Sequence, residues 1–180
     1  PLQHASDSML KSMRRGITSD KTRALLDTVR NKIPNIAIRT TFISGYPGET
    51  EQDHETLIRF LEELRFERVG VFTYSHEENT HAYTLNDDVD ETTKQRRLDE
   101  LMQVQQNISD SINQKKIGKN FRTLFDRKEG NYFIGRTEYD SPEVDNEVLV
   151  DANENYVRVG DFANIKITSA EAFDLYGTLS

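Results

Sequence analysis

A strand, a tight turn and the start of a helix follow one another without interruption in residues 40–50, TTFISGYPGET. Pro47 fixes φ at the second position of the turn, and Gly48 tolerates a positive φ at the third. Thr50 and Asp53 have the spacing of a capping box, which predicts that a helix begins there. A turn of this kind brings backbone N–H groups and a helix N-terminus to one edge of a sheet. The stretch therefore predicts an α/β fold with a ligand site at that edge.

Helices and strands alternate on both sides of this stretch. Ser6 has the position of an N-cap for a short helix that ends at Gly16, and Thr18 caps a second helix that ends before Pro34. The remaining pattern predicts strands at 36–43 and 68–75 and a long helix at 91–116. This order is typical of a parallel sheet, although the strands are too few to close a barrel.

The long helix carries a stripe of apolar side chains and several polar pairs. We expect Arg96, Arg97, Gln105 and Gln106 to lie on its solvated face.

From Gly118 the chain changes to short alternating segments that are separated by turns. This pattern predicts a small antiparallel all-β barrel. The expected strands are 121–127, 131–137, 147–150, 161–169 and 172–179. We therefore expect two domains, residues 1–116 and residues 117–180.

Charge and composition exclude several classes of function. The net charge of −8 argues against broad, charge-driven binding to nucleic acid or anionic lipid and favours a basic partner. Residues 116–180 contain 8 basic and 12 acidic residues, so this part alone carries −4. The chain contains no cysteine, which excludes thiolate ligands within it. No membrane-spanning run or signal peptide is visible, so we expect a cytoplasmic protein.

Seven motifs carry a resemblance to a known family. They are PLQHAS, MRRG, RTTFISGYPGET and GVFTYSHEENTHAY in the first part, and GRTEYDSPEVDNEV, VGDFANIKI and DLYG in the second. Together they resemble the radical-SAM methylthiotransferase family, in particular its RimO branch. The PGET turn is shared with the sister MiaB branch, which modifies tRNA, whereas GRTEYDSPEVD and DLYG point to the RimO branch.

The resemblance implies a fold and an activity. Residues 1–116 would form the C-terminal half of a partial (β/α) radical-SAM barrel of the TIM type, and residues 117–180 an OB-like TRAM barrel. The full-length protein would add a methylthio group to the β-carbon of an aspartate in a small-subunit ribosomal protein. The start at Pro1 without a methionine leads us to expect a piece of a longer protein.

The resemblance also implies cofactors. Family members use S-adenosylmethionine and two 4Fe-4S clusters, and the radical chemistry belongs to these cofactors. The cluster cysteines would lie outside this chain, in a further cysteine-bearing domain and in the CxxxCxxC loop of the first half of the barrel. The fragment alone would therefore bind neither cluster and would be inert. His4, His54, His76 and His81 lack metal-ligand spacing, and we assign none of them a metal.

The cofactor residues should lie at the C-terminal ends of strands. By the resemblance, Gln3, His4 and Ser6 would hold the ribose and the amino-acid end of S-adenosylmethionine; the alternative is that Ser6 only caps a helix. Alternation along residues 36–43 directs Arg39 and Thr41 into the barrel, where a guanidinium needs an anion. That anion would be the methionine carboxylate or a substrate carboxylate, or else an acidic side chain from the missing half.

Two further groups complete the predicted cofactor site. By the resemblance, the backbone of Gly45, Pro47 and Gly48 would approach adenine, with Ile43 as an apolar contact, and the alternative for Pro47 and Gly48 is a plain turn. Phe72, Tyr74 and Ser75 end the second strand, where the family contacts adenine and where core packing is the alternative fate for aromatic side chains.

An acidic segment of the barrel is the candidate surface for a partner. We expect Glu138, Asp140, Glu143 and Asp145 to bind a basic ribosomal protein, with a solvated loop as the alternative. Two other functions stay open, a tRNA methylthiotransferase of the MiaB type and a non-catalytic binding module. The parent is expected to be a monomer, whereas the open sheet edges of a half barrel invite self-association of the fragment.

Overall fold

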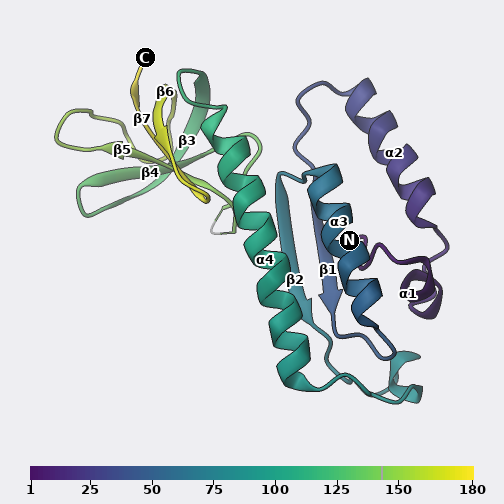
Figure 1. The fold of residues 1–180 in the computed structure, drawn as a ribbon. Coiled ribbons are helices and arrows are strands. Elements are labelled where there is room, and N and C mark those ends of the chain that lie inside the picture. The colour runs from purple at the N-terminus through teal and green to yellow at the C-terminus, as the bar shows by residue number, and fades with distance from the viewer. Residues whose placement is uncertain (143) are drawn as a thin grey trace. The chain divides into compact units, whose positions relative to one another are not determined.

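The computed structural model describes residues 1–142 and 144–180, which form two compact units, residues 1–105 and residues 106–180 (Figure 1). The predicted boundary between residues 116 and 117 stays a prediction. The elements of the first unit are α1 (Asp7–Ser12), α2 (Ser19–Lys32), β1 (Arg39–Ser44), α3 (Glu51–Leu64), β2 (Arg68–Thr73), the 3-10 helix η1 (Ala82–Thr84) and most of α4 (Glu91–Gln114). The second unit contains β3 (Asn120–Glu129), β4 (Tyr132–Thr137), β5 (Glu147–Asp151), β6 (Phe162–Ala170) and β7 (Asp174–Leu179).

The first unit is built on a parallel sheet, as the βα alternation predicts. β1 and β2 pair in parallel from Arg39 opposite Arg68 to Ser44 opposite Thr73. Gln3 extends the sheet through a parallel bridge to Phe42 on the other side of β1. The chain therefore brings its first residues next to the end of β1.

One face of this sheet is covered by α3 (Figure 1). The ring of Phe42 lies 6.3 Å from that of Phe60 and 6.1 Å from that of Phe66, and all three side chains are fully buried. Alternation along the strands places Thr41, Ile43 and Phe72 on the opposite face. These three residues belong to the cavity described below.

The predicted ends of several elements are wrong by a few residues, and β1 and α1 show why. β1 begins at Arg39 and not at residue 36, because Ile38 uses its N–H to bind the Glu67 carboxylate rather than a neighbouring strand. α1 ends at Ser12 and not at Gly16. Its left-handed residue is Arg14, at φ 56, and the N–H groups of Arg14 and Arg15 bond back to the last turn.

The predicted solvated face of α4 is wrong for two residues. Arg97 and Gln105 are buried at 5% and 2% exposure. Each reaches the backbone of another element, Arg97 at the oxygen of Glu49 and Gln105 at the oxygen of Phe66. These hydrogen bonds offset part of the cost of burying the two polar side chains.

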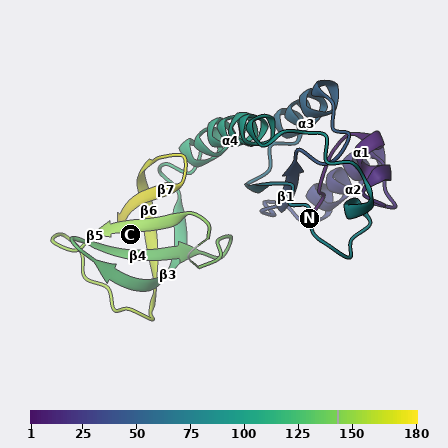
Figure 2. The ribbon, with the colours of Figure 1, turned by 90° about the horizontal axis from the view of Figure 1, so that it is seen from below.

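The second unit is a closed barrel with the strand order β3-β4-β5-β7-β6 (Figure 2). β5 and β7 pair in parallel, and the other pairings are antiparallel, so the prediction of an entirely antiparallel barrel is wrong at that closure. Five strands in a barrel of this kind are typical of the OB fold. Its core includes Phe125, Phe133, Val148, Val150, Ile165, Ile167 and Leu175.

Among the described residues, no helix combines the length and the apolar character that crossing a bilayer requires.

Candidate functional site

A cavity of about 540 Å³ opens at the C-terminal ends of β1 and β2. This is the edge at which ligands of parallel sheets bind. Its apolar lining includes Met13, Ile43, Tyr46 and Tyr74. Tyr46 and Tyr74 form one buried cluster with Met9, so aromatic side chains make up a rigid part of the wall.

Polar atoms from distant segments complete the lining. Gln3 is held with a positive φ of 75, which is uncommon for a residue other than glycine, by backbone hydrogen bonds to Thr41 and Ile43. Its Oε1 is buried without a hydrogen-bond partner among the described residues. A strained backbone and an unsatisfied acceptor at a cavity wall are typical of a ligand site.

The turn after β1 is organised by the buried carboxylate of Glu49. Its Oε2 accepts hydrogen bonds from the N–H groups of Gly45 and Tyr46, while the backbone N–H of Glu49 closes the turn to the Tyr46 oxygen at 2.9 Å. Burial raises the pKa of Glu49, and the Arg97 charge and these two hydrogen bonds oppose that rise. Gly48 has φ 80, as a turn with glycine at its third position requires.

The helix after the turn begins as the capping box predicts. Thr50 accepts from the N–H of Asp53, and Asp53 accepts from the N–H of Thr50. Ser6 and Ser8 also donate to Asp53. Burial favours a higher pKa for Asp53, but the hydrogen bonds from Ser6, Thr50 and Ser8 outweigh it and lower that pKa to about 2. Ser6 is at the N-cap of α1, but its side chain makes no capping hydrogen bond to that helix, and its hydroxyl contacts Asp53 and the Ser8 hydroxyl instead.

His4 lies beside this hydrogen-bonded group and is almost fully buried. Its Nδ1 accepts from the N–H of Ser6 at 2.9 Å, so the neutral tautomer carries its proton on Nε2. Burial lowers the pKa of His4 to about 4, against the smaller effect of the Asp53 charge. The neutral ring therefore fastens the start of the chain beside the start of α3.

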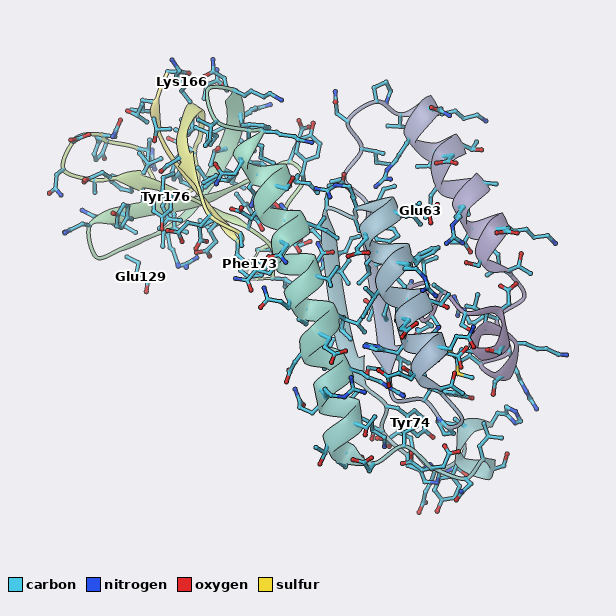
Figure 3. The ribbon with its side chains drawn as sticks, viewed as in Figure 1. Glu63, Tyr74, Glu129, Lys166, Phe173 and Tyr176 are labelled. Carbon is cyan, nitrogen blue, oxygen red and sulfur yellow. The ribbon has the colours of Figure 1, made fainter. Side chains whose placement is uncertain are left out.

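The structure brings six of the predicted cofactor residues together. Those that line the cavity are Gln3, Thr41, Ile43, Phe72, Tyr74 and Ser75. Figure 3 shows Tyr74 where β2 passes into the loop that leads to α4. Their assignment to a cofactor stays a prediction.

The other four predicted cofactor residues do not line the cavity. His4 accepts from the N–H of Ser6, whose hydroxyl donates to Asp53, and Gly45 lies in the turn after β1. Arg39 is exposed at the first position of β1, the end of the strand away from the cavity. The sequence pattern placed Arg39 in the middle of a strand, which is why it was expected beside the ligand.

Two side chains of α4 that sequence reasoning missed hold the cavity turn. Lys94 and Arg97 are buried, and both contact residues 44–49. A charged residue in a helix is ordinarily read as exposed, but the spacing of residues 94, 97, 101 and 105 matches a buried face.

The predicted docking residues of the barrel have different surroundings. Asp140 is buried and accepts from the Thr137 hydroxyl, and Asp145 accepts from the N–H of Ser141 at 2.8 Å. Glu138 is exposed. Glu143 lies outside the described residues. The docking surface stays a prediction, and both buried or half-buried carboxylates already shape the loop.

Within residues 1–142 and 144–180, one group of side chains has ligand atoms close enough to share a metal ion. These atoms of Glu51, His54 and Glu100 lie within 4.8 Å of one another. Arg96 donates to both Glu51 and Glu100 at 2.8 and 2.7 Å, so a guanidinium already supplies the positive charge between these carboxylates. The arrangement therefore favours an ion-pair network.

Comparison with known proteins identifies relatives of both parts of the chain. Residues 117–179 match the family model of the TRAM domain. A protein of Christiangramia forsetii named "Ribosomal protein uS12 methylthiotransferase RimO" is 60% identical over 98% of this chain and 39% of its own length. Proteins of the same name from Cytophaga hutchinsonii and Flavobacterium johnsoniae are 58% identical over 99% of this chain and 59% identical over 98% of it, respectively.

The chain spans about two fifths of the length of these curated relatives, 41% for the Cytophaga hutchinsonii protein and 40% for the Flavobacterium johnsoniae protein. Among solved structures, a multidomain protein with nucleic acid binding domains from Streptococcus pneumoniae is 14% identical. It covers 37% of this chain and 24% of its own with a TM-score of 0.31, a similarity too low to support a conclusion.

Proposed function

We propose, from a chain that is a relative of the C-terminal part of the RimO methylthiotransferases, that the protein to which it belongs is a radical-SAM methylthiotransferase. That protein would transfer a methylthio group to the β-carbon of an aspartate in a small-subunit ribosomal protein, in the cytoplasm where ribosomes are found. The observation that carries the proposal is the 60% identity over 98% of the chain.

The first unit fits the C-terminal half of a partial (β/α) barrel. Its strands are parallel, each is followed by a helix, and its cavity lies at the C-terminal ends of the strands. The bridge from Gln3 to β1 supplies the edge at which preceding strands would continue the sheet.

The cavity fits S-adenosylmethionine in chemistry. The unpartnered Oε1 of Gln3 is an acceptor for a ribose hydroxyl or an ammonium group, and Ile43, Phe72 and Tyr74 offer apolar contact to a base. When bound, S-adenosylmethionine supplies the radical chemistry of the reaction. The residues of this chain would bind and orient it and keep water away from it.

Iron-sulfur clusters do not fit the residues of this chain. The sequence holds no cysteine, and thiolates are the usual ligands of 4Fe-4S clusters. We therefore assign the two clusters of the full-length protein to thiolates outside residues 1–180, and no step of the reaction to a cluster held here.

The barrel would dock the ribosomal protein. In OB folds the face of the second and third strands, here β4 and β5, is a common binding surface. Tyr132 of β4 and Tyr176 of β7, the strand on the other side of β5, lie 6.3 Å apart. Burial, and to a smaller extent the charges of Glu147 and Glu171, raises the pKa of Asp174 at the start of β7. Figure 3 shows Tyr176 on this unit. Aromatic rings beside carboxylates suit the lysine and arginine side chains of a basic protein.

A chimera tests the activity. This chain replaces the corresponding C-terminal part of the Christiangramia forsetii protein, and mass spectrometry follows the ribosomal protein uS12 incubated with the reconstituted chimera. We expect a mass increase that corresponds to one methylthio group on an aspartate. A chimera that cleaves S-adenosylmethionine but leaves uS12 unmodified would contradict the substrate assignment.

A binding titration of the full chain against uS12 and against tRNA tests the partner. We expect uS12 to bind more tightly and its affinity to fall with added salt. Preferential binding of tRNA would favour the MiaB type of methylthiotransferase. If the chimera modifies uS12 although this chain alone binds neither uS12 nor tRNA, the docking surface lies outside this chain.

A further inference from the structure

Lys94 is a buried lysine that is not part of the cavity lining. Its side chain is 1% exposed, although it lies in the first turns of a helix in which residues 91, 92, 95 and 96 are exposed. Lysine is rarely buried to this degree unless its charge is paired. What surrounds Lys94 therefore indicates why the chain keeps a lysine there.

The aliphatic part of Lys94 packs against the end of β1. A Cβ atom placed on Gly45 would lie 2.1 Å from Cγ of Lys94, so the backbone of the turn and the lysine stem are in close contact. The Ser44 hydroxyl donates to the main-chain oxygen of Lys94 at 3.1 Å. α4 and the cavity turn are thereby joined at one position.

The ammonium group of Lys94 lies among two carboxylates and an aromatic ring. Its Nζ is 2.9 Å from Asp87, 2.8 Å from Glu91 and 5.4 Å from the centre of the Tyr74 ring. Burial alone would lower the pKa of Lys94, but the hydrogen bonds to Glu91 and Asp87 outweigh it, so the group stays charged. The carboxylate side chains are 26% and 81% exposed and therefore remain solvated without the lysine.

Tyr74 carries this contact into the cavity. Its ring lies 5.4 Å from that of Tyr46 in an edge-on arrangement, and both residues line the cavity. Tyr46 in turn donates to the main-chain oxygen of Ser12. Lys94 thus contacts the aromatic wall without itself lining the cavity.

We propose that Lys94 is a positioning residue of the cavity, which fixes the Tyr74 ring through its ammonium group and the turn at Gly45 through its aliphatic stem. The identity of the ligand as S-adenosylmethionine rests on the proposed function. The contact of Lys94 with Tyr74 and Gly45 is independent of the proposed function.

Variants of the full chain test the contact itself. Lys94→Met keeps most of the stem and removes the charge, Lys94→Arg keeps a charge, and Lys21→Met removes an exposed lysine of α2 as a matched control. The titration of Tyr74 is followed by NMR through its ring carbon bonded to the hydroxyl. We expect a higher pKa of Tyr74 in Lys94→Met only, because a nearby cation that favours the phenolate is lost. An unchanged Tyr74 resonance in folded Lys94→Met would overturn the proposal.

The same substitutions in the chimera test the positioning role. We expect Lys94→Met to raise KM for S-adenosylmethionine about fivefold, the size of one lost cation–π contact, with a smaller change of kcat. Lys94→Arg should recover part of the loss, and Lys21→Met should match the unsubstituted chimera. A shifted Tyr74 titration together with an unchanged KM would refute positioning, whereas an unsubstituted chimera without S-adenosylmethionine binding would refute the proposed function instead.

Discussion

Nη1 of Arg97 lies 3.0 Å from the main-chain oxygen of Glu49 and 3.4 Å from the carboxylate of the same residue. The Glu49 side chain is fully buried, and its other carboxylate oxygen accepts two backbone N–H groups of the turn. A guanidinium from α4 therefore balances the charge on which the turn after β1 depends.

Arg97→Met should destabilise the chain by about 3 kcal/mol, because it leaves a buried carboxylate without its cation. The neighbouring Arg96, with 44% of its side chain exposed, offers the matched control. Arg96→Met should cost no more than about 1 kcal/mol, as exposed ion pairs do. Urea denaturation of the two variants measures the difference, and equal losses would show that the buried pair has no special weight.

Gly45→Ala should be far more damaging than Gly48→Ala. Both glycines have a positive φ, 75 and 80, which costs an alanine about 1 kcal/mol. Only at position 45 does the added Cβ meet another atom, Cγ of Lys94, and nothing lies within 4 Å at position 48. Thermal unfolding of the two variants and of Gly45→Ala combined with Lys94→Ala tests this reason. The double variant should regain part of the loss, and failure to do so would place the clash elsewhere.

His4 predicts a loss of stability at mildly acidic pH. Burial lowers its pKa from 6.5 to about 4, so the folded chain resists a proton that the unfolded chain accepts. The buried His4 therefore costs no stability above pH 6.5. The free energy of unfolding falls by about 3 kcal/mol as the pH is lowered from 6.5 to 4. His4→Asn retains an acceptor for Ser6 but does not titrate. Its unfolding free energy should change less over that range, and a parallel pH profile would contradict the assignment.

Asp53 predicts a separate loss at lower pH. Its hydrogen bonds outweigh the effect of burial and lower its pKa from 3.8 to about 2, so its contribution is present above pH 3.8 and is lost as the pH falls toward 2. Partial exposure limits the effect to about 1–2 kcal/mol. Asp53→Asn should remove this loss of stability below pH 3.8. Circular dichroism during acid titration follows the unfolding that measures it. Asp27→Asn, at an exposed position of α2, should leave the loss of stability below pH 3.8 unchanged.

The strand, turn and helix start of residues 40–53 could be predicted because their causes are local. Pro47, Gly48, Thr50 and Asp53 impose backbone angles or caps on their immediate neighbours, and the structure confirms the turn and the capping box. The barrel strands were likewise predicted from alternation and turns. The parallel pairing of β5 with β7 was missed because it depends on closure and not on any local pattern.

The residues that hold the cavity were harder to predict because their partners are distant in sequence. Nothing near Arg97 or Lys94 indicates a buried carboxylate at Glu49 or an aromatic ring at Tyr74. Arg39 shows the opposite error, since an alternating pattern cannot tell at which residue a strand begins to pair. Local sequence patterns therefore predicted the helices and strands. Whether a charged side chain is buried or exposed depends on tertiary contacts, which those patterns do not reveal.

The close contact of Gly45 with Lys94 also restricts how this protein can evolve. Any residue with a side chain at position 45 needs a shorter side chain at position 94, and a shorter residue there withdraws the cation from the Tyr74 ring. A substitution at position 45 is therefore tolerated only after position 94 has acquired a shorter side chain. We expect positions 45 and 94 to covary among homologous sequences.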